Sequence, residues 1–118
     1  MLCKKWVRWL ALRAFVPRPW ALAEEDVSVL LDAAGAPAAT PMLQQGKTYT
    51  PDAAYRKITR PVWIIGGNRD MICPPADLQE FAADHSFVQS VHLIDGVGHL
   101  PMFEATEQYH ETLRRYLT

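Results

Sequence analysis

The hydrophobic residues of this chain follow a helical spacing in its first half and a strand-like pattern in its second half. In the first half, four apolar residues recur at intervals of three and four: Val27, Leu30, Leu31 and Ala34. This spacing predicts a helix over 24–34, and Gly35 directly after it predicts a left-handed helix cap with positive φ. A shorter helix is expected over 5–15, before Pro17 and Pro19 interrupt the pattern.

Residues 35–52 show no sustained hydrophobic period. They contain residues that interrupt regular structure: Pro37, Pro41, Gly46 and Pro51. Such a composition is typical of a loop, so a loop or poorly regular stretch is predicted here. One more helical turn is expected over 52–57.

The second half predicts two strands and two helices. Residues 61–66, with the sequence PVWIIG, form a continuous apolar run that is typical of a strand covered on both faces. A helix is expected over 75–84, a second strand over 91–95 and an amphipathic helix over 105–118. Two strands joined by one helix predict a parallel pair with a right-handed crossover, and therefore an α/β fold.

An aspartate and a histidine follow the two predicted strands. Asp70 lies four residues past Gly66, and His99 lies four residues past Asp95. Sites in parallel sheets form beyond the carboxyl ends of the strands, and neighbouring strands lie about 4.8 Å apart. We therefore expect these two side chains to meet. Neutral imidazole can take a proton from a hydroxyl near pH 7, and a carboxylate on its other nitrogen orients it.

The residues alone leave a structural interpretation open. A histidine in a glycine-containing loop is often structural, and an aspartate after a strand often caps the next turn. Asp95 is a rival acid, although its place at the strand end favours a role in shaping the turn. The other histidines, His85, His92 and His110, have no metal-ligand spacing and are expected to be structural or solvated.

The segments around Asp70 and His99 resemble the α/β-hydrolase family. Residues 61–70, followed by two prolines, are similar to the family's strand and acid loop, and GHLPMFE at 98–104 is similar to its histidine loop. The resemblance implies that 58–118 form the C-terminal βαβα portion of an α/β-hydrolase core. Residues 1–57 resemble the helical lid of that family more distantly, and the tryptophans of this lid-like part are expected either to line an apolar cavity or to pack the lid itself: Trp6, Trp9 and Trp20.

The resemblance implies esterase-like acyl hydrolysis, with Asp70 as the orienting acid and His99 as the general base. The family's nucleophile turn, G-x-S-x-G, is absent from these residues, because no serine is flanked by glycines. Cys73 has no such turn either, and a proline follows it. We therefore expect a truncated or split hydrolase that is inactive alone and supplies two members of a Ser-His-Asp triad. The alternative is a catalytically inactive hydrolase-derived fragment or a partner-binding module.

Composition narrows the classes of partner. A hydrophobic content of 49% argues against disorder, and a formal net charge of −1 gives no support to a nucleic-acid partner. No apolar run reaches about 18 residues and no signal peptide is evident, so a cytoplasmic location without a membrane is expected.

Cys3 and Cys73 are expected to be free thiols, and no cofactor or metal is expected. The expected partners are a small-molecule substrate in the complete enzyme and, at the open sheet edge, an N-terminal half or a second copy.

Overall fold

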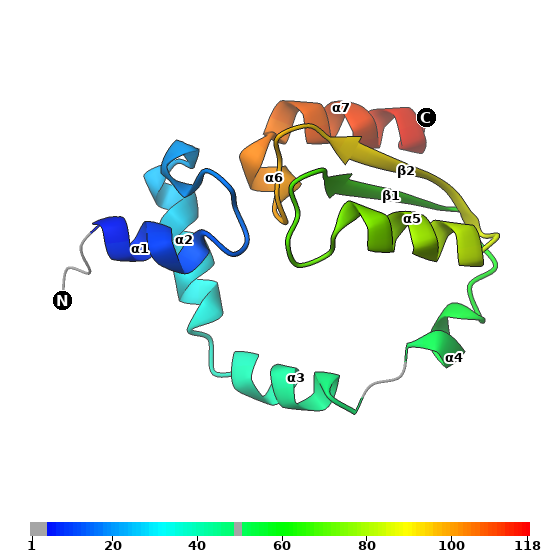
Figure 1. Cartoon of the computed structure of the whole chain (residues 1–118), viewed down its shortest axis with the longest axis horizontal. Coiled ribbons are helices and arrows are strands. Elements are labelled where there is room, and N and C mark those ends of the chain that lie inside the picture. Colours follow the sequence, from blue (N-terminus) through cyan, green and yellow to red (C-terminus); the bar gives the residue numbers. More distant parts are fainter. Residues whose placement is uncertain (1–4, 49–50) are drawn as a thin grey trace.

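The computed structural model describes residues 5–48 and 51–118, so Cys3 lies outside the described residues. Its elements follow one another in the order α1 (Lys5–Leu12), η1 (Pro19–Ala21), α2 (Glu24–Ala34), α3 (Ala39–Gly46), α4 (Asp52–Tyr55), β1 (Val62–Gly67), α5 (Pro75–Asp84), β2 (Val88–Ile94), α6 (Pro101–Glu104) and α7 (Thr106–Leu117). Figure 1 shows α1, η1 and α2 as one group and the sheet with α5, α6 and α7 as another, with α3 and α4 along an arc between them.

β1 and β2 pair in parallel, which confirms the predicted α/β fold. α5 packs on one side of the pair and α7 on the other (Figure 1). Side chains along β1 alternate between the two helices that cover the sheet. Trp63 stacks on Tyr116 of α7, while Gly66 faces Leu78 of α5. The apolar run at 61–66 is thus a strand with a helix on each face, as its sequence predicted.

The N-terminal helices dock onto the carboxyl rim of the sheet through the segment between α1 and η1. Val16 of this segment is 1% exposed, and Pro19 of η1, Val27 of α2 and Val97 of the loop after β2 are each buried as well. A Cβ at Gly98 would collide with the carbonyl oxygen of Phe15, so the two segments are in direct backbone contact. The segment that contains Phe15 therefore connects the lid-like residues to the loop that carries His99.

Two predictions in the N-terminal half are wrong. Residues 39–46 form α3 where a loop was predicted, because Pro41 lies in the first helical turn, where a missing N–H leaves no intrahelical bond unmade. Gly35 has φ −84° rather than a positive φ. The last carbonyls of α2 are instead satisfied by right-handed turns, with Gly35 N–H donating to Leu31 O and Ala36 N–H donating to Ala33 O.

Element ends also differ from the sequence patterns. β2 begins at Val88 rather than at residue 91, because Gln89 and Ser90 extend the strand without adding to its apolar signal. The predicted helix over 105–118 is α7. A separate short helix, α6, comes before it, and Ala105 lies between the two. α1 ends at Leu12, earlier than the prolines suggested.

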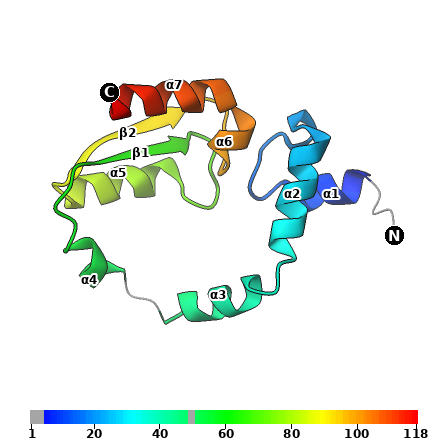
Figure 2. The ribbon, with the colours of Figure 1, turned by 180° about the vertical axis from the view of Figure 1, so that it is seen from behind.

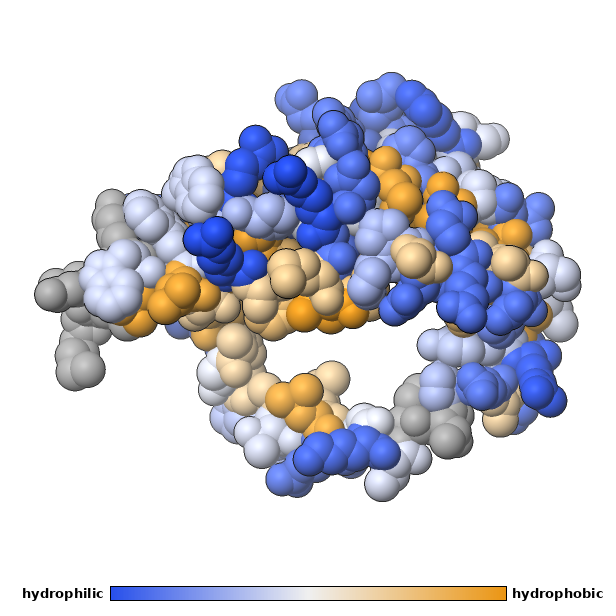
Figure 3. Space-filling view, viewed as in Figure 1, coloured by the Kyte–Doolittle hydropathy of each residue, from blue (hydrophilic) through white to orange (hydrophobic). Residues whose placement is uncertain are grey.

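The described chain is more open than a single compact domain. Its radius of gyration is 16.2 Å, against about 13–14 Å for a compact chain of this length. The view from behind shows the same two groups, with α3 and α4 along the arc that connects them in the chain (Figure 2). In Figure 3 an opening remains between the arc of α3 and the rest of the molecule, with hydrophobic surface at its border. Within residues 5–48 and 51–118, no helix is long and apolar enough to cross a bilayer.

Candidate active site

Asp70 and His99 meet beyond the carboxyl ends of β1 and β2. Nδ1 of His99 lies 2.9 Å from Oδ2 of Asp70. The aspartate side chain is 5% exposed and the histidine side chain is 32% exposed. The carboxylate is therefore buried behind the imidazole, and Nε2, on the opposite side of the ring, is the nitrogen left for a reacting hydroxyl.

The acid loop holds the Asp70 carboxylate by its second oxygen. Oδ1 accepts hydrogen bonds from the N–H groups of Ile72 at 2.8 Å and Cys73 at 2.9 Å. Burial raises the pKa of Asp70, but the hydrogen bonds from Cys73, His99 and Ile72 outweigh it, so this pKa lies below its usual value of 3.8. At neutral pH the group is a carboxylate, which accepts a hydrogen bond from Nδ1–H and so favours the imidazole tautomer with its hydrogen on Nδ1.

The β1 and β2 loops are joined by their own contacts. Arg69 N–H donates to Val97 O at 2.8 Å, and a Cβ at Gly67 would collide with the carbonyl oxygens of the histidine loop. The Asn68 side chain donates to the Asp95 carboxylate and accepts from Gly96 N–H. Asp95, the rival acid, therefore shapes the turn after β2, and it is Asp70 whose carboxylate contacts His99.

Glu104 of α6 holds the histidine loop through its backbone. Its carboxylate accepts from Gly98 N–H at 3.0 Å and from Leu100 N–H at 3.1 Å, the residues on either side of His99. His99 N–H itself donates to Phe15 O at 2.7 Å. Sequence reasoning assigned Glu104 no role. The signal that could have indicated this role is a glutamate at the end of a short helix that begins with a proline directly after the histidine loop.

The remaining candidates stay apart from this pair. His85 Nδ1 bonds to Phe81 O at the end of α5, His110 is exposed on α7, and His92 is half-buried in β2. Among the serines, Ser28 bonds to Arg8, while Ser90 lies at the opposite end of β2 from His99. Within the described ranges, no serine is held against the histidine.

Cys73 is the one further reactive side chain beside the pair among the described residues. Its thiol is free and exposed. Partial burial of its sulfur raises the pKa of this thiol, as do the carboxylates of Asp70 and Asp77, so less of it is thiolate near neutral pH. Asp70, Cys73 and His99 also form a group whose oxygen, sulfur and nitrogen atoms could hold a metal ion, with the donor atoms within 4.8 Å of one another.

A cavity of about 390 Å³ opens beside the dyad. Its lining consists of Arg13, Ala14, Phe15, Pro17, Arg69 and Met71. Its connection to the pair is through neighbours: the ring of Phe15 lies 6.2 Å from the imidazole of His99, and Arg69 and Met71 flank Asp70 in the chain. Its volume falls in the range of small-molecule sites.

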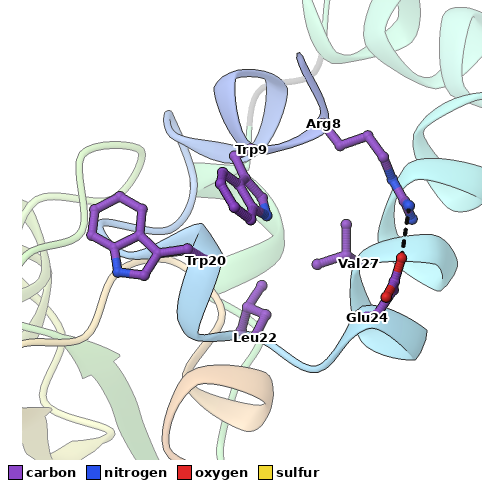
Figure 4. A pocket seen from close by; sticks show the side chains of 6 residues that line it. All are labelled: Arg8, Trp9, Trp20, Leu22, Glu24 and Val27. Carbon is purple, nitrogen blue, oxygen red and sulfur yellow. Dashed lines mark ion pairs between the residues drawn. The ribbon is translucent and has the colours of Figure 1, made fainter. Parts of the chain in front are cut away.

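A smaller cavity of about 160 Å³ lies among α1, η1 and α2 (Figure 4). Trp9 and Trp20 line it, and the Arg8–Glu24 ion pair closes one side at 3.6 Å. Trp6 is 59% exposed and does not line it. Trp9 and Trp20 thus border a cavity that also holds an ion pair, and not the apolar cavity that was one of the two expectations.

Comparison with known proteins gives two matches. A family model described as "Alpha/beta hydrolase family" matches residues 4–112. The crystal structure of a "putative lipase" from Acinetobacter baumannii AYE is similar, with a TM-score of 0.73 and 24% identity, over 97% of this chain and 41% of that chain. This chain therefore spans about two fifths of that protein, and at this identity the likeness shows the fold alone. No curated protein matches the chain.

Proposed function

The chain belongs to the alpha/beta hydrolase family, and on that premise we propose that it supplies the acid and the base of a Ser-His-Asp triad in an esterase-like acyl hydrolase. Asp70 is the acid and His99 is the base. One observation carries the proposal, namely the 2.9 Å contact between Asp70 Oδ2 and His99 Nδ1 at the carboxyl rim of two parallel strands. The imidazole is one-third exposed, and a cavity of substrate size is lined by Phe15, whose ring contacts the imidazole, which supports a reacting role for its other nitrogen.

The chemistry of each residue follows from its bonds. Asp70 accepts a hydrogen bond from Nδ1–H, so Nε2 carries a lone pair and can take the proton of a serine hydroxyl. The serine oxygen attacks the acyl carbonyl, and the protonated imidazole then gives its proton to the leaving alcohol. In the second half, His99 takes a proton from water as the water oxygen attacks the acyl carbonyl. It then returns this proton to the serine oxygen, whose bond to the acyl carbon breaks as the carboxylic acid is released. The Asp70 carboxylate holds the tautomer and stabilises the imidazolium in both halves, and replacing such an acid by its amide costs about 10⁴ in kcat in triads of this kind.

The proposal assigns the nucleophile to a second segment of polypeptide, an N-terminal half on the same or on a separate chain. No serine in these 118 residues has the glycine-flanked turn that exposes an attacking oxygen. The similar lipase is more than twice as long as this chain. Large apolar side chains are exposed on several elements and would suit burial by such a half: Leu10, Trp63, Met42, Leu43 and Met71.

An alternative proposal is a catalytically inactive partner-binding module. Among the described residues β1 pairs only with β2, so its other edge offers free backbone groups to an added strand. A second copy of this chain could use the same edge. In that case the Asp70–His99 contact would serve only to hold the two loops together, and ester turnover would never depend on it.

Complementation separates the two proposals. The chain is mixed with a hydrolase N-terminal half that carries a G-x-S-x-G turn, taken from the DNA directly upstream if it encodes one, and p-nitrophenyl ester turnover is measured. The mixture should turn over while the chain alone should not, and His99→Ala and Asp70→Asn should each remove the activity. His110→Ala is the matched control, because His110 is exposed on α7. Activity indifferent to His99→Ala, or a His99-dependent rate in the chain alone, would contradict the proposal.

A further inference from the structure

Three different donor atoms converge where the acid loop meets the histidine loop. A carboxylate oxygen of Asp70, Sγ of Cys73 and a ring nitrogen of His99 all lie within 4.8 Å of one another. The backbone keeps them there, because the Cys73 N–H donates to the same carboxylate that contacts the imidazole. The wide sequence separation between Cys73 and His99 gave no metal-ligand spacing, and it is the parallel strand pair that brings them together.

We propose that Asp70, Cys73 and His99 bind a Zn²⁺ ion, and that zinc binding switches the dyad off. Thiolate sulfur, imidazole nitrogen and carboxylate oxygen are the ligands that zinc takes, and three protein ligands leave a fourth position for water. The first part of the proposal stands without a nucleophile. The second part rests on the proposed function of the dyad.

The geometry is close to what a tetrahedral zinc needs. Zinc bonds of about 2.0–2.3 Å place neighbouring ligand atoms about 3.3–3.6 Å apart. The donors lie no more than 4.8 Å apart, so the sulfur must approach by about 1 Å at most. The Cys73 side chain is exposed and can rotate. The His99–Asp70 pair, now at 2.9 Å, has to open by only a few tenths of an ångström.

The charges and protons balance. One carboxylate and one thiolate offset the two charges of the ion, and the imidazole stays neutral. Binding releases one proton, from Sγ of Cys73. The proton on Nδ1 of His99 moves to Nε2, because Nδ1 is the ring nitrogen that lies against Asp70 and becomes the ligand.

This proton shift makes metal binding and base catalysis exclude each other. With zinc on Nδ1, the Asp70 carboxylate no longer holds a proton there, and Nε2 carries a hydrogen. A protonated Nε2 cannot accept the proton of a hydroxyl, so the base is lost. Removal of zinc by a chelator restores the original tautomer.

The test uses the full chain with Co²⁺ as a spectroscopic probe and Zn²⁺ as competitor. One equivalent of Co²⁺ should give a thiolate-to-cobalt charge-transfer band, and Zn²⁺ should displace it. Cys73→Ser should abolish this band and weaken Zn²⁺ binding more than about tenfold, since even outer-shell partners of metal ligands contribute about 10–100-fold. Cys3→Ser and His110→Gln are the matched controls and should keep the band.

Three results would overturn the site: no thiolate band in the native chain, a band that survives Cys73→Ser, or a band lost in Cys3→Ser. Cys73 is exposed, so its replacement by serine leaves the fold intact. Nitrogen-15 NMR of His99 separates this proposal from the proposed function. A cobalt band in a chain whose metal-free His99 has no Nδ1–H would support the zinc site and contradict the proposed dyad. An Nδ1–H without a cobalt band would support the dyad and contradict the zinc site.

Discussion

Replacement of Glu104 tests how the histidine loop is held in place. The Glu104 carboxylate accepts hydrogen bonds from the part-buried N–H groups of Gly98 and Leu100. Glu104→Ala removes both acceptors at once. A buried N–H without a partner costs about 1–3 kcal/mol, and partial access of water to this loop favours the lower part of that range. The expected loss is therefore about 2–4 kcal/mol of unfolding free energy.

Urea unfolding followed by far-ultraviolet circular dichroism measures this loss. With a slope of about 1–3 kcal/mol per molar urea, the midpoint should fall by about 1 M or more. Glu80→Ala is the matched control, because Glu80 is an exposed glutamate on α5. Its effect should stay within about 0.5 kcal/mol. Equal midpoints for the two variants would refute the reasoning, since they would mean that the Glu104 carboxylate holds nothing.

Two further predictions concern the same rim of the sheet. The pKa of Asp70 is lowered in the folded chain, so the ionised group stabilises the fold at pH values above its usual pKa of 3.8, and this contribution is lost as the pH falls through the lowered pKa. The urea midpoints of the native chain and Asp70→Asn, measured without metal, should therefore differ at pH 6 and approach each other as the pH falls below 3.8 and through the lowered pKa; a constant gap would contradict this. Gly67→Ala should destabilise the chain by about 1–3 kcal/mol, because the added Cβ collides with two carbonyl oxygens of the histidine loop. Gly46→Ala, where nothing lies within 4 Å of the new Cβ, should have little effect, and equal losses in a urea series would count against the close approach of the loops.

Elements with a strong local pattern could be predicted from the sequence. The helix over 24–34 has an apolar stripe and begins and ends where it was predicted. The run at 61–66 has an uninterrupted apolar pattern, which marks a strand between two layers. Because parallel strands deliver their following loops to one rim, the contact between Asp70 and His99 could also be predicted before any coordinates.

Features set by contacts between distant segments could not be predicted. The Glu104 carboxylate bonds to backbone N–H groups, and a backbone donor leaves no trace in residue identity. The bond between His99 N–H and Phe15 O joins residues that no spacing rule relates. α3 was missed because its proline was interpreted as a helix breaker rather than as a first-turn residue.

Nitrogen-15 NMR of the metal-free chain at neutral pH tests the central claim most directly. The claim is that Asp70 holds His99 with its proton on Nδ1 and its lone pair on Nε2. The account predicts that the His99 imidazole is neutral with a protonated Nδ1 in the native chain, and that Asp70→Asn removes this preference. A proton on Nε2 in the native chain, or identical spectra for the native chain and Asp70→Asn, would contradict it.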